Sequence, residues 1–185
     1  MILHKGTQQL ETERLILRRY RMDDAADMYE NWVADSEVTR FWGWKPHENI
    51  EETKTLLQGW ICDYEKTDHY HWVIEDKAQA KAIGYIYLNE MDDAEACAAV
   101  HYLLSRKHWN RGIMTEACTS VLDFAFAELG LQKVVSRHHE LNPASGRVLK
   151  KCGFRFLYKE CKMFADCPQL DGVYLLYEKG LLDKK

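Results

Sequence analysis

One segment of the chain joins an apolar run, a polar turn and the start of a helix, in the sequence LLSRKHWNRGIMTEA at residues 103–117. The free N–H groups in the first turn of a helix, with the helix dipole behind them, bind anions such as phosphate. Gly112 allows a positive φ or a close approach of the backbone to an anion. Arg106, Lys107 and Arg111 add positive charge. The segment indicates a phosphate site; the alternative is an ordinary connection with a basic surface.

Hydrophobic periodicity predicts the elements that position this segment. Strands are expected at 13–20, 69–76, 82–90, 96–105, 133–139, 154–162 and 172–179. Helices are expected from Asp23 to Asp35, behind Asn49, from Met114 to Leu129 and from Pro143 to Gly153. This order predicts one parallel crossover among antiparallel hairpins. We therefore expect a mixed α/β (α+β) fold, with a mostly antiparallel central sheet and helices on both faces.

Length and composition limit the classes of protein. The 185 residues suit a single domain, and the motifs described next imply that its core covers about residues 10–179. Lys and Arg total 25 and Asp and Glu total 29, and a net charge of −4 argues against nucleic-acid binding. No uncharged run reaches the ~20 residues that span a bilayer, and the first residues lack the apolar region of a secretory signal. Six cysteines without a Cys-x-x-Cys pair predict reduced thiols and a cytoplasmic protein.

Four motifs in order resemble the GNAT N-acetyltransferases, most closely the RimJ/RimL branch of ribosomal-protein N-terminal acetyltransferases. WNRGIMTEA at 109–117 resembles the family's acyl-CoA pyrophosphate loop, and ETERLILR at 11–18 its opening strand. AIGYI at 82–86 is similar to its third-strand motif, and NPAS at 142–145 with KCGF at 151–154 is similar to N-x-x-S…K-x-G-F. The resemblance implies a GNAT fold, acetyl-CoA as co-substrate, no metal, and transfer to a primary amine of a small molecule or a protein N-terminus.

The resemblance also implies a set of cofactor-binding residues. They are Leu103, Leu104, Trp109, Asn110, Arg111, Gly112, Ile113, Met114, Thr115, Asn142 and Ser145. Asn110 stands where glycine is usual, and we expect the loop to be kept because Asn tolerates left-handed backbone. The main chain of Leu103 and Leu104 is expected to bond pantetheine where two strands splay apart. For Asn142, a purely capping role is the alternative.

Candidate catalytic residues are fewer. Ser145 is predicted to protonate the leaving thiolate, because Leu149 occupies the position where many relatives have tyrosine; the alternative is a bond from Ser145 to its own helix. Relatives often carry EIGYW before the loop, where this chain has Ala99-Val100-His101-Tyr102-Leu103. His101, which ordinarily titrates near neutrality, is the first candidate for the base and Glu90 the reserve. A packed core histidine is the alternative for His101.

Several features leave alternatives open. The aromatic run with Phe41, Trp42 and Trp44 lines an acceptor cleft or flanks the core. The histidines at 69, 71, 138 and 139 lack the ligand spacing that completes a known metal site. A CoA-binding sensor without transferase activity is the alternative function, because Ala99 replaces a glutamate; a plain interaction module is a third. The last two strands allow a homodimer through sheet extension.

Overall fold

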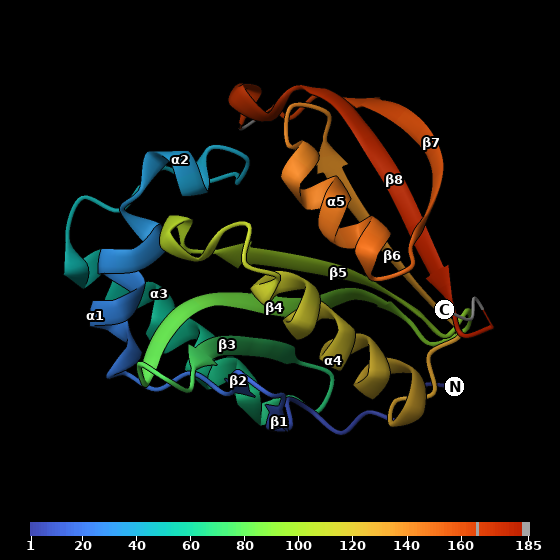
Figure 1. Cartoon of the computed structure of the whole chain (residues 1–185), viewed down its shortest axis with the longest axis horizontal. Coiled ribbons are helices and arrows are strands. Elements are labelled where there is room, and N and C mark those ends of the chain that lie inside the picture. Colours follow the sequence, from blue (N-terminus) through green and yellow to red (C-terminus); the bar gives the residue numbers. More distant parts are fainter. Residues whose placement is uncertain (166, 183–185) are drawn as a thin grey trace.

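The computed structural model describes residues 1–165 and 167–182, and it is built around one eight-stranded sheet in the order β1-β2-β3-β4-β5-β6-β8-β7 (Figure 1). The strands are β1 (Leu10–Glu11), β2 (Leu15–Arg18), β3 (Tyr70–Asp76), β4 (Lys81–Asp92), β5 (Cys97–Leu104), β6 (Lys133–His139), β7 (Arg155–Lys162) and β8 (Gly172–Gly180). The α-helices are α1 (Asp24–Met28), α2 (Ser36–Thr39), α3 (Ile50–Cys62), α4 (Ile113–Ala127) and α5 (Pro143–Lys151).

The expected topology is confirmed. Strands β5 and β6 are parallel, and every other neighbouring pair is antiparallel. The helix expected from Asp23 to Asp35 is divided instead, because a π-helical turn follows α1 at Tyr29–Val33 and the Asp35 side chain caps α2 by accepting from Glu37 N. All six cysteines are free thiols. Among the described residues, no helix has the length and apolarity to cross a membrane.

Helices cover both faces of the sheet, with α4 and α5 on one face and α1 and α3 on the other (Figure 1). The predicted apolar stripe of α4 is buried, including Ala117, Cys118 and Val121 at 0% exposure. The other face is more aromatic, with Trp32 and Tyr85 in its core. The two faces therefore offer different surroundings, and a ligand that passes between the strands would meet both.

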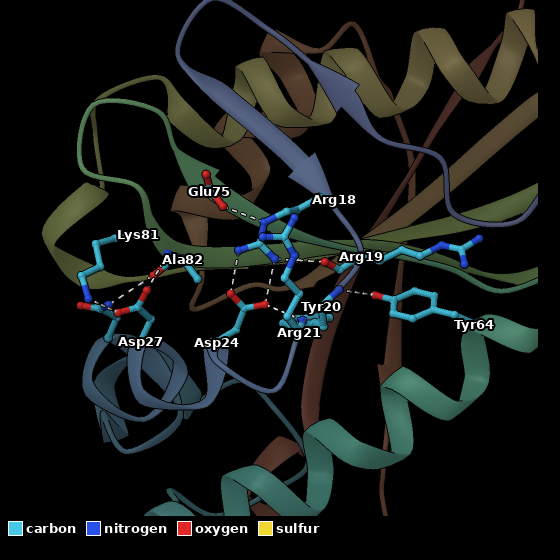
Figure 2. A network of polar contacts seen from close by, with 11 residues as sticks. Arg18, Arg19, Tyr20, Arg21, Asp24, Asp27, Tyr64, Glu75, Lys81 and Ala82 are labelled. Atoms are coloured by element: carbon cyan, nitrogen blue, oxygen red, sulfur yellow. Dashed lines mark hydrogen bonds and ion pairs between the residues drawn. The ribbon is translucent and has the colours of Figure 1, made fainter.

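An ion-pair network fixes α1 against the sheet (Figure 2). The Arg18 guanidinium donates to both carboxylate oxygens of Asp24, at 2.9 and 2.7 Å, and its Nε donates to Glu75 Oε2 at 2.6 Å. These bonds raise the pKa of Arg18, although burial acts against them. Asp27 adds a second link, because it accepts from Lys81 Nζ and from Ala82 N. The network joins β2, β3, β4 and α1 and holds the aromatic face in place.

The parallel ladder between β5 and β6 is short. It joins Cys97 with Lys133, Ala98 with Val134 and Ala99 with Val135. One further link follows, from Ser136 Oγ to the carbonyl of Val100 at 2.8 Å. Beyond it the strands share no ladder, so a gap opens between the ends of β5 and β6. We call it the strand gap.

Candidate active site

The polar turn between β5 and α4 is held by its own side chains. Ser105 Oγ and His108 Nδ1 lie 2.6 Å apart, and both residues are buried. The Trp109 indole Nε1 donates to the carbonyl of Leu104 at 2.7 Å, while the ring is 41% exposed. These bonds close a 3-10 turn over Arg106–His108 and fix the direction in which the chain enters α4.

The backbone just before α4 has the geometry of an anion site. Asn110 has φ 60° and Gly112 has φ 76°, which confirms the expectation that Asn110 is left-handed. Gly112 stands at the N-cap without a side-chain cap, so no described residue accepts from the N–H groups of Ile113, Met114 and Thr115. Free donors at the positive end of a helix are the arrangement that suits a phosphate, and this 15-residue helix offers three of them.

Two motifs from distant parts of the sequence meet beside this site. The Glu116 carboxylate accepts from Thr12 Oγ1 at 2.5 Å, from Arg14 N at 3.0 Å and from Arg14 Nε at 2.7 Å. Arg14 Nη1 also donates to the carbonyl of Arg111 at 3.0 Å. Burial acts to raise the pKa of Glu116, but the bonds from Thr12 and Arg14 outweigh it and lower that pKa. The ETER segment and the TEA segment therefore brace the loop together.

Positive charge near the loop is only partly neutralised. Arg106 forms an ion pair with Asp35 at 3.0 Å. The side chains of Lys107 and Arg111 are exposed and pair with no carboxylate in the described part of the chain. They leave net positive charge beside the free N–H groups in an otherwise acidic protein. The predicted phosphate site therefore has both the donors and the charge that it needs.

The main chain of β5 fits the expectation for Leu104 but not the one for Leu103. Ser105 N donates to the carbonyl of Ile83 on β4. Along a strand, the main-chain groups of successive residues point alternately to the neighbouring strand on either side. Leu103, which pairs with Tyr85, therefore directs its N–H and C=O toward β4 as well. Its main chain is engaged within the sheet, so we no longer expect Leu103 to bond pantetheine.

The main-chain N–H and C=O groups of the even-numbered residues of β5 point toward the strand gap instead. Val100 shows this direction, because its carbonyl accepts from Ser136 of β6. Tyr102 and Leu104 share it by alternation. The carbonyl of Leu104 is taken by Trp109, which leaves the N–H of Leu104 and both main-chain groups of Tyr102 at the gap. Leu104 therefore stays a candidate for bonding pantetheine, and Tyr102 takes the place of Leu103.

Ser145 lies at the gap in the first turn of α5. Asn142 caps this helix by accepting from Ser145 N at 3.3 Å, so its capping role is shown. Ser145 Oγ lies 3.0 Å from the Tyr102 hydroxyl, which also donates to the Ser145 carbonyl at 3.0 Å. Leu149 is fully buried. Burial raises the pKa of Tyr102 well above its ordinary value, so its hydroxyl keeps its proton.

Tyr102 is the residue that sequence reasoning missed. It stands within an apolar strand, where a tyrosine usually signals packing. One signal was available: strand alternation places Tyr102 on the same face as Leu104, and a buried tyrosine hydroxyl needs a hydrogen-bond partner. The partner comes from α5, and sequence patterns do not reveal which helix packs on that face.

His101 lies on the opposite face of β5. Its ring stacks on Tyr87 at 5.0 Å between centroids, and no described group hydrogen-bonds to its buried Nε2. Burial and then the nearby Arg137 lower its pKa to about 4, against the opposing effect of Glu90. The expectation that His101 titrates near neutrality is therefore wrong, because desolvation disfavours the charged ring. Glu90, the reserve candidate, is bound by Arg137 Nη2 at 2.8 Å.

The aromatic loop flanks the core and also borders a cavity, while its role as an acceptor cleft stays a prediction. Phe41 stacks on His139, with ring centroids 5.6 Å apart. Trp42 and Trp44 pack against the aromatic core and also line a cavity of about 540 Å³ between α3 and the sheet. In the described ranges, no three His, Cys, Asp or Glu side chains are grouped to hold a metal ion.

Comparison with known proteins identifies the family. The profile of the Acetyltransferase (GNAT) domain matches residues 14–155. The chain is 32% identical over 146 residues to the uncharacterized N-acetyltransferase YoaA of Bacillus subtilis, covering 79% of this chain and 82% of that one. It is 26% identical to a spermidine N(1)-acetyltransferase of Vibrio cholerae, covering 76% and 79% of the two chains.

Solved structures agree on the fold. The ribosomal-protein-S5-alanine acetyltransferase of Vibrio fischeri superposes with a TM-score of 0.80 at 20% identity, covering 96% of this chain and 99% of that one. The protein belongs to the GNAT family of acetyl-CoA-dependent N-acetyltransferases.

Proposed function

We propose that this enzyme transfers the acetyl group of acetyl-CoA to a primary amine, on a small molecule or a protein N-terminus, across the strand gap. The single observation that carries the proposal is the loop ahead of α4. There, left-handed Asn110 and Gly112 leave three helix N–H groups free beside the gap. A diphosphate fits these donors, and the same loop places the rest of the cofactor along β5.

The other cofactor contacts follow from the same geometry. Ile113, Met114 and Thr115 hold the pyrophosphate, with Arg111 as the nearby cation. Pantetheine lies in the strand gap, where the main chain of Tyr102 and the N–H of Leu104 bond it, and Trp109 fixes the entrance. The amide nitrogen of Asn142, which donates to no described residue, adds a further donor at the gap.

On the acid side, Ser145 donates a proton to the leaving thiolate. Tyr102 is a positioning residue, because its hydroxyl bonds both Ser145 Oγ and the Ser145 carbonyl. Tyr102 keeps its own proton, so it stays a neutral hydrogen-bond partner, and the proton that Ser145 loses is replaced from solvent. Ser145 thus keeps a defined orientation toward the gap.

On the amine side, His101 is neutral at pH 7. With a pKa of about 4, it accepts a hydrogen bond from the amine more readily than it keeps a proton. The amine arrives as an ammonium, loses that proton to solvent, and then donates an N–H of its neutral form to His101. Glu90 supports this arrangement by neutralising Arg137, which would otherwise repel an incoming ammonium.

Calorimetry with acetyl-CoA, followed by an amine panel with thiol detection of released CoA, tests the proposal. We expect binding and turnover, and Ser145→Ala should lower kcat by about 10²-fold while the Kd for acetyl-CoA stays within about twofold. Ser36→Ala, at an exposed serine on α2, is the matched control. Binding without CoA release on any amine would favour a sensor instead, and absence of binding would refute both readings.

A further inference from the structure

The cavity between α3 and the sheet is walled by rings from four elements. α3 contributes Trp60, and strands β3 and β4 contribute the other rings of the sheet wall. The loop after α2 contributes Trp42 and Trp44, and Trp42 packs on Tyr85 and Tyr87 of β4. We call the ring-lined part of this cavity the aromatic box; it consists of Trp42, Trp44, Trp60, His71, Tyr85 and Tyr87. Its volume of about 540 Å³ is that of a small-molecule site.

The angles between the rings decide which shape fits. Trp60 meets His71 at 60° and Tyr85 at 66°, and Trp42 meets Tyr85 at 64°. Tyr87 meets His71 at 60° as well. Steep angles form corners, whereas a flat ligand needs two parallel walls. The aromatic box is therefore shaped for a compact group that touches several ring faces at once.

The charges of the walls favour a cation. Among the described residues that line the cavity there is no Lys or Arg, and the one carboxylate, Asp63, already pairs with Lys66 at 2.6 Å, so the ring faces supply the attraction. Burial lowers the pKa of His47, His69 and His71, the last to about 3, so these rings are neutral at pH 7. Aromatic faces attract cations through their quadrupole, most strongly when the site is desolvated.

Several side-chain oxygens in the cavity walls have no hydrogen-bond partner among the described residues. The hydroxyls of Tyr85 and Tyr87 bond to no described residue, and both keep their protons because burial raises their pKa values. Asn89 Oδ1 is shielded from solvent and also lacks a partner in the described ranges. Rotation of its carboxamide would turn this acceptor toward a ligand. Oxygen acceptors beside ring faces suit a ligand that brings N–H donors.

One ring separates the aromatic box from the amine side of the gap. Tyr87 lies 5.3 Å from His71 within the box and 5.0 Å from His101, between ring centroids. An acceptor could therefore present one nitrogen at His101 and place a second in the box. Resting on the proposed function, we propose that the aromatic box binds a second, protonated amino group of the acceptor, and that the substrates are short alkyl diamines.

Tryptophan fluorescence tests this without any turnover, because three tryptophans line the box. We expect 1,4-diaminobutane to bind at least about tenfold more tightly than 1,4-butanediol, which has the same length and no charge. Trp44→Leu should remove this preference, and Trp44→Phe, which keeps a ring face, should retain most of it. Both variants should bind acetyl-CoA with unchanged affinity. Equal binding of the diol and the diamine, or an unchanged preference in Trp44→Leu, would overturn the inference.

Transfer kinetics separate this inference from the proposed function. The kcat/KM for 1,4-diaminobutane should exceed those for 1-aminobutane and 4-aminobutanoate by about tenfold or more, mainly through KM. Similar values for all three, or preference for a peptide N-terminus over every diamine, would overturn the aromatic box while leaving the acetyltransferase standing. Tight diamine binding without transfer to any amine would support the box and refute the proposed function.

Discussion

Replacing Glu116 by Gln should loosen the loop that precedes α4 while keeping the shape of the side chain. The carboxylate accepts from Thr12 and twice from Arg14, and Arg14 Nη2 lies 2.6 Å from it as an ion pair. Hydrogen bonds to charged groups contribute about 1.5–3 kcal/mol each, but Arg14 is exposed enough for solvent to screen its share, so we expect about 2 kcal/mol in all. For a chain of this size, that lowers Tm by about 4–8 °C.

Two measurements check this prediction. Thermal unfolding at pH 7 should show the Tm shift, and calorimetry should show about fivefold weaker acetyl-CoA binding, which corresponds to about 1 kcal/mol. The weaker binding follows because Arg14 would no longer hold the carbonyl of Arg111. Glu128→Gln is the matched control, because Glu128 lies after α4 and forms an exposed pair with Lys5. It should change Tm by less than about 2 °C.

The pH dependence gives a further check on Glu116. Its pKa is lowered in the folded protein, so its stabilising contribution is complete above the ordinary value of 4.5 and is lost as the pH falls through the folded pKa. The Tm difference between the wild type and Glu116→Gln should therefore persist at pH 6 and shrink below about pH 4. Equal Tm values at pH 7 would refute the bracing role.

Asn110→Gly should keep acetyl-CoA affinity within about twofold, whereas Asn110→Val should weaken it about tenfold. The reason is that left-handed backbone costs an ordinary side chain roughly 1–2 kcal/mol. Equal affinities of the two variants in calorimetry would count against the loop geometry. Tyr102→Phe should lower kcat about fivefold in the wild type and leave kcat unchanged in Ser145→Ala. The reason is that Tyr102 affects turnover through its neutral hydrogen bond with Ser145 Oγ. The same fold-change in both backgrounds would assign Tyr102 another role. The unfolding free energy should fall as the pH drops from 6.5 to about 4, because over this range His101 takes up a proton only in the unfolded chain. Urea titrations of His101→Gln should show a shallower fall. An equally steep fall in this variant would mean that His101 is charged in the folded protein.

The sequence predicted the fold well because its signals are local. Strand β6 begins and ends where alternation placed it, and α4 and α5 lie within two residues of their expected bounds. The helix expected from Asp23 to Asp35 is the main exception. Its apolar positions continue through the π-helical turn, so periodicity alone could not show the break at Ala34.

The site could be predicted only where its groups belong to one segment. The left-handed geometry of Asn110 and Gly112 follows from residue type, and the structure confirms it. The pKa of His101 depends on burial under Tyr87 and on Arg137 from another strand, which no pattern in β5 records. The bond from Tyr102 to Ser145 has the same origin, since it joins two elements that meet only in the folded chain.

The three-residue ladder between β5 and β6 divides the sheet into two parts that share few backbone bonds. Strands β1 to β5 form one plate, and β6, β8 and β7 form the other, with α4 and α5 packed across the join through Thr119 and Cys152. Little backbone bonding resists a change in the angle between the plates. Under the proposed function, the pantetheine amides of the thioester cofactor would lie where rungs between β5 and β6 are missing.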